Sequence, residues 1–169
     1  MAVGPRDEVW VRVERVVDGD TIVVSLLGEK ERVRLIGVDT PETVAPNRPI
    51  GCYGPEASEF TKEQLEGKLV KLTTSTFQRP RDDYGRLLAY VWVDLDGDGQ
   101  LDNFNLELLK RGYARTTGFN HDLRREFLRA EREAREKQRG CGEGVARGVR
   151  HFSCGDEQPA RHKVSFQGP

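Results

Sequence analysis

Apolar and polar residues alternate near the start of the chain. Residues 9–17 place valine on alternate positions at first, which is the period of a strand with one buried face. Residues 21–27 are β-branched and apolar, and residues 31–38 alternate again. Residues 18–20 and 28–30 supply the turns between them. The pattern predicts a meander of three strands.

A helix and two more strands are predicted after a long loop. Residues 39–53 hold several prolines and a glycine, a composition typical of a loop. Helical spacing then runs from Pro55 to Gly67, because proline is favoured in the first helical turn and glycine after the last. Residues 69–76 and 87–93 predict strands, separated by a polar loop.

Two more helices are predicted in the second half, over residues 105–111 and 122–139. The longer one has a thin apolar stripe, so we expect it to pack against the outside of a barrel. The stripe consists of Leu123, Phe127, Ala130 and Ala134. Five strands and three helices in this order indicate an α+β domain, mainly a small Greek-key β-barrel.

Length and composition fit one soluble domain. The chain has 169 residues, 36% of them hydrophobic, a mean hydropathy of -0.65, and no run near the roughly 18 apolar residues that cross a membrane. We expect residues 8–147 to form the domain and residues 148–169 a poorly ordered tail. Residues 1–8 lack the apolar run of a signal peptide, so we expect a cytosolic protein or the trimmed form of an exported one.

Charge and cysteine content exclude little. Lys and Arg number 27 and Asp and Glu 28, for a net charge of -1. This argues against tight coating of nucleic acid, but not against an enzyme with a few arginines in one cleft. The chain has three cysteines, Cys52, Cys141 and Cys154, so at least one thiol stays free if a disulfide forms. The two later cysteines could bind zinc together with His151 and His162, but their spacing matches no common zinc site.

Two acids and an arginine gather in residues 34–42, Arg-Leu-Ile-Gly-Val-Asp-Thr-Pro-Glu. Arg34 and Asp39 would face opposite sides of a regular strand, unless the chain bends at Gly37. Such residues can cleave a phosphate ester, since one acid holds a cation, the other handles a proton and the arginine binds phosphate oxygens. A surface ion-pair cluster is the alternative.

Two turns add further candidates. Asp18-Gly19-Asp20-Thr21 has the sequence of a tight hairpin turn, and together with Asp39 it could supply oxygen ligands to Ca²⁺. Asp83-Tyr84-Gly85-Arg86 precedes the fifth strand, where Arg86 could bind a phosphate. Taken alone, each is an ordinary turn.

Taken together, these segments resemble the thermonuclease (staphylococcal nuclease-like) family in order and spacing. The resemblance covers about residues 9–140 and rests on residues 17–21, 34–42, 53–58 and 83–90. It implies an OB-fold barrel of five strands with three helices. It also implies a Ca²⁺-dependent nuclease that cleaves DNA and RNA and leaves 3′-phosphates.

The resemblance also implies roles for individual residues. The implied calcium ligands are Asp20, Asp39 and the backbone carbonyl of Thr40. The implied catalytic residues are Arg34, Glu42 and Arg86. Tyr84 corresponds to a residue that contacts nucleotide phosphate. The implied substrates are DNA and RNA, single-stranded or locally melted, acted on by a monomer, and calcium need together with family habit suggests export.

The chain departs from the family pattern near the nucleotide. Asp83 stands where the best-known member has a lysine, so we expect weaker phosphate binding. The family's base-stacking tyrosines are not evident after the short helix, and Phe119 is the candidate to replace them as a stacking platform.

Residues 94–105 follow the spacing of an EF-hand loop, with acids at the first, third, fifth and ninth positions and glycine at the sixth. Asn105 takes the place of the usual final glutamate. A polar hairpin turn is one interpretation and a second calcium site is the other. The ligands of such a site would be Asp94, Asp96, Asp98, Gln100 and Asp102.

Two other functions stay open at this point. One is a non-catalytic OB-fold module that binds nucleic acid or protein, although inactive relatives lose the acids and arginines that this chain keeps. The other is an extracellular calcium-binding interaction domain built on residues 94–105. Digestion of a plasmid with Ca²⁺ or with EDTA separates both from a nuclease.

If the loop binds a second calcium, Asp98→Ala should reduce the rise in melting temperature that calcium causes, because a carboxylate ligand is lost. Cleavage should persist, since the loop is separate from the candidate catalytic residues. Thermal melting with and without calcium tests this, and an unchanged calcium effect in the variant would remove the idea.

Overall fold

The computed structural model describes residues 8–41 and 54–137. The strands of the described part are β1 (Glu8–Asp18), β2 (Thr21–Leu26), β3 (Glu29–Leu35), β4 (Val38–Asp39), β5 (Leu69–Thr73), β6 (Leu87–Val93), β7 (Asp102–Asn103) and β8 (Arg115–Thr116). The helices are α1 (Gly54–Leu65), α2 (Phe104–Lys110) and α3 (Arg124–Glu136).

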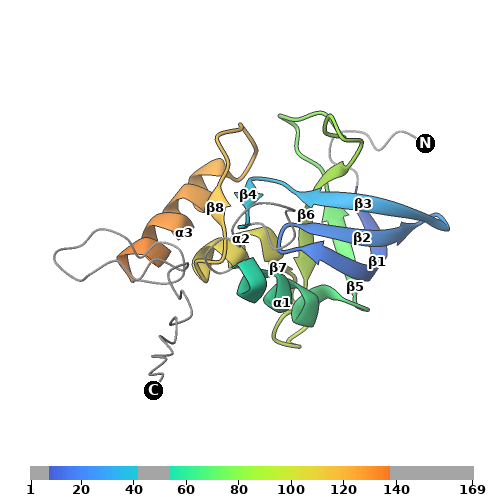
Figure 1. Cartoon of the computed structure of the whole chain (residues 1–169), viewed down its shortest axis with the longest axis horizontal. Helices are drawn as coiled ribbons and strands as arrows, with labels where there is room; N and C mark the ends of the chain where they lie inside the picture. Colours follow the sequence, from blue (N-terminus) through green and yellow to red (C-terminus); the bar gives the residue numbers. More distant parts are fainter. Residues whose placement is uncertain (1–7, 42–53, 138–169) are drawn as a thin grey trace, which may run out of the picture.

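A closed β-barrel forms one half of the molecule (Figure 1). The strand order β3-β2-β1-β5-β6 is antiparallel throughout, and a parallel pairing of β3 with β6 closes the ring. In that pairing Arg34 lies opposite Leu88 and Leu35 opposite Ala89. The predicted OB-fold barrel of an α+β domain is therefore confirmed.

The alternation in the sequence decides which side chains fill the barrel. Val11 and Val13 of β1 are buried, while Trp10 and Arg12 between and beside them are exposed. Opposite faces of a strand carry successive side chains, so one face of each strand reaches the core and the other remains outside. Burial of the apolar face is the main force that holds the barrel closed.

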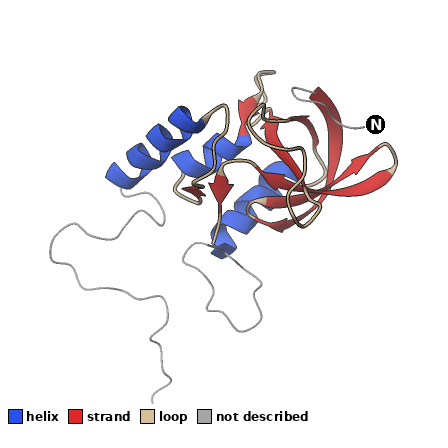
Figure 2. Ribbon diagram, turned by 90° about the horizontal axis from the view of Figure 1, so that it is seen from above, coloured by secondary structure: helices blue, strands red, loops and turns tan. Residues whose placement is uncertain are grey.

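The helices lie beside the barrel rather than around it (Figure 2). α1 packs on β1 and buries Ala57, Thr61 and Leu65. The predicted stripe of α3 is correct, because Phe127 and two alanines are buried. However, α3 packs mainly on α2 and β8, and on the barrel side its Phe127 ring lies 6.1 Å from the ring of Tyr90 on β6.

Some element ends differ from the sequence-based prediction. The predicted strand 69–76 ends at Thr73, because Thr76 leaves the sheet and donates from its backbone N–H and hydroxyl to the carboxylate of Asp122. The same contact keeps Asp122 out of the last helix, which starts at Arg124. β7 and β8 are two-residue strands that no periodicity indicated.

Buried Asn105 ties the first turn of α2 to the barrel. Its Oδ1 accepts from the backbone N–H of Val91 at 3.0 Å, and its Nδ2 donates to the carbonyl of Ile36 at 2.9 Å. The side chain is fully buried. Such an amide, satisfied on both ends, fixes the chain just after β3 against β6.

The third predicted strand, 31–38, is broken at Gly37. This residue has a φ of 76°, a conformation that glycine adopts without strain. A Cβ there would meet Nε2 of His121 at 2.6 Å and Cδ2 of Phe127 at 2.9 Å. Both the backbone and the neighbouring rings therefore require glycine, and the chain turns here to form β4.

His121 fills the space under this turn. Its Nδ1 lies 2.9 Å from the Tyr90 hydroxyl, and its Nε2 has no hydrogen-bond partner among the described residues. Burial lowers the pKa of His121 below the usual 6.5, with Asp122, Arg124 and Glu126 as smaller influences of both signs. Neutral imidazole is thus the form that the folded protein favours.

Several predictions concern residues outside the described part. The three cysteines, the proposed tail 148–169 and the last ten residues of the expected domain 8–147 all lie there, and these predictions stay open. Within the described residues, no helix is long and apolar enough to span a membrane.

Gly37→Ala should destabilise the protein by about 2–5 kcal/mol, since it combines backbone strain with a clash in a packed region. Gly28→Ala is the matched control, because Gly28 has a φ of 87° and nothing within 4 Å of a new Cβ. It should cost only about 1 kcal/mol. Urea unfolding of both variants measures the difference, and equal losses would contradict the role of crowding.

Stability should fall as the pH is lowered from about 7 to about 5, because His121 binds a proton more readily in the unfolded chain than in the folded protein. His121→Gln keeps a partner for the Tyr90 hydroxyl and does not titrate. In this variant the decline should be flatter, as measured by urea unfolding at both pH values. The same decline in both proteins would show that another group is responsible.

Candidate active site

Asp20 is held firmly at the turn between β1 and β2. One carboxylate oxygen, Oδ2, accepts from the backbone N–H of Thr40 at 2.7 Å and from its hydroxyl at 3.0 Å. The other, Oδ1, accepts from the hydroxyl of Thr21 at 3.0 Å. Gly19 makes this approach possible, because a Cβ there would lie 2.9 Å from the Thr40 side chain. The turn thus fixes the position of the Asp20 carboxylate.

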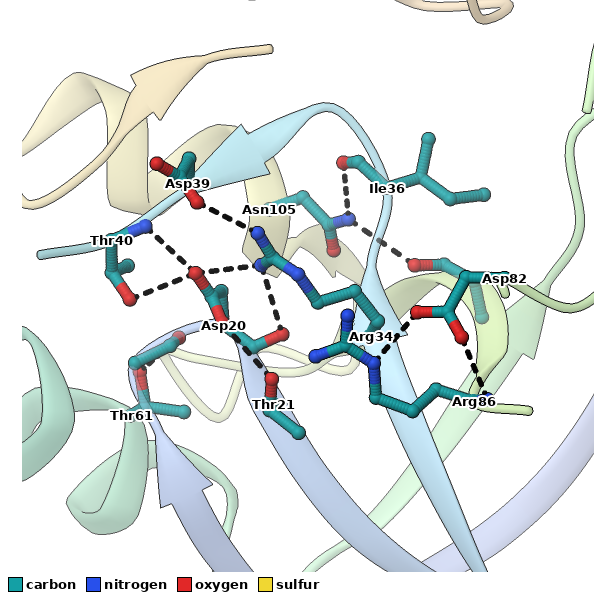
Figure 3. A network of polar contacts seen from close by, with 12 residues as sticks. Asp20, Thr21, Arg34, Ile36, Asp39, Thr40, Thr61, Asp82, Arg86 and Asn105 are labelled. Atoms are coloured by element: carbon teal, nitrogen blue, oxygen red, sulfur yellow. Dashed lines mark hydrogen bonds and ion pairs between the residues drawn. The ribbon is translucent and has the colours of Figure 1, made fainter. Parts of the chain in front are cut away.

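Arg34 bridges the two acids of the site (Figure 3). Its Nη1 lies 2.6 Å from Oδ2 of Asp20, and its Nη2 lies 2.8 Å from Oδ1 of Asp39. The side chain of Asp20 is only 9% exposed and that of Arg34 16%, whereas Asp39 is 68% exposed. Two carboxylates therefore converge on one cationic group at the edge of solvent.

The turn at Gly37 explains how Arg34 and Asp39 meet. In an unbroken strand they would face opposite ways, but β3 ends at Leu35 and β4 starts at Val38. Asp39 then pairs with Arg115 of β8 instead of continuing along β3. The sequence is compatible with a bend at Gly37, and the structure has this bend. It brings the side chains of Arg34 and Asp39 into contact.

Arg86 reaches the site from the chain just before β6, the strand that pairs with β3 to close the barrel. Arg34 lies opposite Leu88 in the parallel pairing, and Arg86 lies two residues before Leu88, so both arginines project from the same face. Figure 3 shows the guanidinium tip of Arg86 pointing toward the Asp20–Arg34 pair. Its Nε donates to Oδ2 of Asp82 at 2.7 Å.

Asp82 is a functional candidate that sequence reasoning missed. Partial burial raises its pKa, but hydrogen bonds from the backbone and side chain of Arg86 and from the backbone of Tyr84 outweigh this and leave the pKa below its usual range. Asp82 therefore stays ionised beside Arg86. The sequence does place this acid four residues before Arg86. In an irregular loop, however, that spacing does not predict that the two side chains meet.

Two adjoining pockets share the arginines. The smaller, of about 130 Å³, is lined by polar residues, including Asp18, which belonged to the candidate turn. Its lining is Asp18, Asp20, Thr21, Arg34, Asp39, Thr40 and Arg86. The larger, of about 420 Å³, is also lined by Arg34 and Arg86 and has Tyr84 and Phe119 at its walls. These aromatic side chains are 86% and 73% exposed.

The acidic departure at Asp83 is offset by a nearby cation. Oδ1 of Asp83 lies 2.5 Å from Nη2 of Arg79, and both residues line the larger pocket. The pair is exposed, so the interaction between the two side chains is weak. The expectation of weaker phosphate binding considered Asp83 alone and did not include this arginine.

The donor set of the small pocket fits a hard divalent cation. Two carboxylates and the backbone of Thr40 offer oxygen ligands, the chemistry that Ca²⁺ and Mg²⁺ prefer. The guanidinium between the carboxylates already shows that a positive charge is accommodated there, and its single charge leaves the two acids only half neutralised. Glu42, the remaining implied catalytic residue, lies outside the described residues.

Within residues 8–41 and 54–137, the small pocket included, no three His, Cys, Asp or Glu side chains are grouped closely enough to hold a metal by themselves. In the loop after β6, both oxygens of Asp94 accept from backbone N–H groups, those of Gly97 and Gly99. Asn105, the last position of the EF-hand spacing, is buried in the barrel contact. A second calcium there stays a prediction.

Sequence comparisons identify relatives of this chain. The family model described as staphylococcal nuclease homologue matches residues 32–141. The thermonuclease of Staphylococcus intermedius is 48% identical over 128 residues, which cover 75% of this chain and 71% of that protein. The thermonuclease of Staphylococcus hyicus is 41% identical over 132 residues, covering 77% and 73%. Endonuclease YncB of Bacillus subtilis is 45% identical over 105 residues, covering 62% and 46%.

The matches agree with the observed fold. The family model begins within β3 and extends past the end of α3, so it includes Arg34, Asp39 and Arg86, while Asp20 lies before it. The relatives are similar to this chain over about three quarters of its length. The chain belongs to the staphylococcal nuclease homologue family.

Proposed function

We propose that this protein is a calcium-dependent nuclease that hydrolyses phosphodiester bonds of DNA and RNA. The observation that carries the proposal is the convergence of Asp20 and Asp39 on Arg34, with Arg34 and Arg86 both lining the small pocket and the larger one. Family membership supports phosphodiester hydrolysis.

Asp20, Asp39 and the carbonyl of Thr40 would hold the cation. When bound, a divalent ion polarises a phosphate oxygen and neutralises developing charge. With the carboxylates engaged by an ion, Arg34 would lose them as partners and its guanidinium would be available to phosphate oxygens. We choose calcium because its ligand shell tolerates irregular oxygen donors, and calcium need in turn favours a role outside the cytosol.

The chain's own residues then stabilise the reaction. Arg34 and Arg86 bind the equatorial oxygens of the phosphate, where negative charge builds up as water adds to phosphorus. Since these contacts strengthen with the charge, they lower the barrier more than they tighten substrate binding. Glu42 orients or deprotonates the water. Cleavage of the bond from phosphorus to the 5′ oxygen leaves a 3′-phosphate and a 5′-hydroxyl.

The larger pocket suits an unpaired nucleotide. Tyr84 and Phe119 expose aromatic faces on which a base can stack, and stacking is tolerant of base identity. Arg79 offers a further cation near the phosphate backbone. A base inside a duplex is not free to enter such a pocket, so we propose that single-stranded or locally melted substrates are preferred.

Cleavage of plasmid DNA and of single-stranded RNA should require calcium and stop with EDTA, and end-group assays should find 3′-phosphates. Arg34→Ala and Glu42→Ser should each lower kcat by a factor of about 10² to 10⁴, since each removes charge stabilisation or proton transfer.

Arg32→Ala is the matched control, an exposed arginine on the same strand that lines neither pocket. It should retain near-normal turnover. Cleavage that persists in EDTA would refute metal dependence, and Arg34→Ala turnover equal to that of Arg32→Ala would refute the role of Arg34.

A further inference from the structure

Asp82 makes an unusual set of contacts for a loop carboxylate. Its Oδ2 accepts from Nε of Arg86 at 2.7 Å, while its Oδ1 accepts from the backbone N–H groups of Arg86 and Tyr84, both at 2.9 Å. The side chain is 17% exposed. Oδ1 thus stabilises the backbone of the turn, and Oδ2 binds the guanidinium of Arg86.

The contact with Nε holds Arg86 at one edge of its guanidinium, whose central carbon also lies 5.4 Å from the centre of the Tyr84 ring. A guanidinium has five N–H donors in a planar fork, and the Nε–H lies on the edge away from one terminal nitrogen. Oδ2 of Asp82 lies 2.7 Å from Nε of Arg86, and Arg86 shares the lining of the small pocket with Asp18, Asp20 and Asp39. Asp82 thus holds Nε, and the terminal nitrogens of Arg86 are directed toward Arg34 and Asp20 (Figure 3), which line the small pocket together with Arg86.

The loop that carries Asp82 is itself anchored to the barrel. Arg81 donates from both terminal nitrogens to the carboxylate of Glu31 on β3, at 2.9 and 2.8 Å, and from Nη1 to the carbonyl of Gly85 at 2.8 Å. The backbone N–H of Asp82 also donates to the carbonyl of Arg86 at 3.0 Å. Asp82 is thus a fixed support rather than a mobile partner.

We propose that Asp82 is the positioning residue for Arg86 in phosphodiester cleavage. The inference rests on the proposed nuclease function. A flexible arginine must lose rotamer freedom as it binds the phosphate, and Asp82 removes that freedom beforehand. Because Arg86 acts where charge develops, misplacing it should affect turnover more than substrate binding.

Asp82→Asn tests this. The asparagine can keep its Oδ1 as acceptor for the two backbone N–H groups, but it presents an NH₂ donor to Nε of Arg86. We expect kcat to fall about 10- to 100-fold while KM changes less than about threefold, as for a contact that matters mainly in the transition state. Equal kcat in wild type and variant would overturn the inference.

Glu107→Gln is the matched control. Glu107 also holds an arginine Nε four residues away, that of Arg111 at 2.8 Å, and its side chain is 18% exposed, but it lies on α2 and lines neither pocket. It should cleave with normal kcat. A fall equal to that of Asp82→Asn would show a general effect of losing such a pair, and would overturn the assignment.

A double-mutant cycle separates positioning from a structural role. In an Arg86→Ala background, Asp82→Asn should cause no further loss of kcat, because the residue to be positioned is gone. A further loss as large as in the wild-type background would contradict the inference.

If Asp82→Asn does not fold, Asp82→Glu is used in its place. It keeps the charge but shifts the carboxylate, so kcat should again fall and Arg86→Ala should again mask the effect. A wild-type protein that does not cleave with calcium would instead refute the proposed function, and this inference with it.

Discussion

The parallel pairing of β3 with β6 is the constraint on which both the barrel and the site depend. It closes the ring of strands, and the same register sets Arg34 beside Leu88, with Arg86 two residues earlier on the same face. A slip by one residue would turn one of the arginines into the apolar interior, among side chains such as Val33 and Leu87. The register that fills the core therefore also fixes the spacing of the two cations.

Much of the fold could be read from the sequence, because the barrel strands carry a clear two-residue period. The period does not reveal where a strand bends, and the turn at Gly37 depends on the rings of His121 and Phe127, which come from far along the chain. β7 and β8 are too short to show any period. Their existence follows from the tertiary contacts of β6 and β4, not from local preference.

The sequence predicted which kinds of residue form the site better than it predicted how their side chains are arranged. Acids and arginines in a recognisable order gave the candidate residues, and the structure brings Asp20, Arg34 and Asp39 into direct contact. Side-chain partners within the loop before β6 were beyond the sequence, since that loop has no regular period. Two such contacts are the ion pair of Asp83 with Arg79 and that of Asp82 with Arg86.

The bridge formed by Arg34 has a consequence for how ligands influence one another. In the state described here the guanidinium is already satisfied by two carboxylates, so a phosphate group and a divalent ion each compete with this internal pair. Under the proposed function, an ion on the carboxylates would free Arg34, and a phosphate on Arg34 would free the carboxylates. Each ligand would then raise the affinity for the other because the internal ion pair is already broken, and thermodynamic reciprocity requires the two factors to be equal.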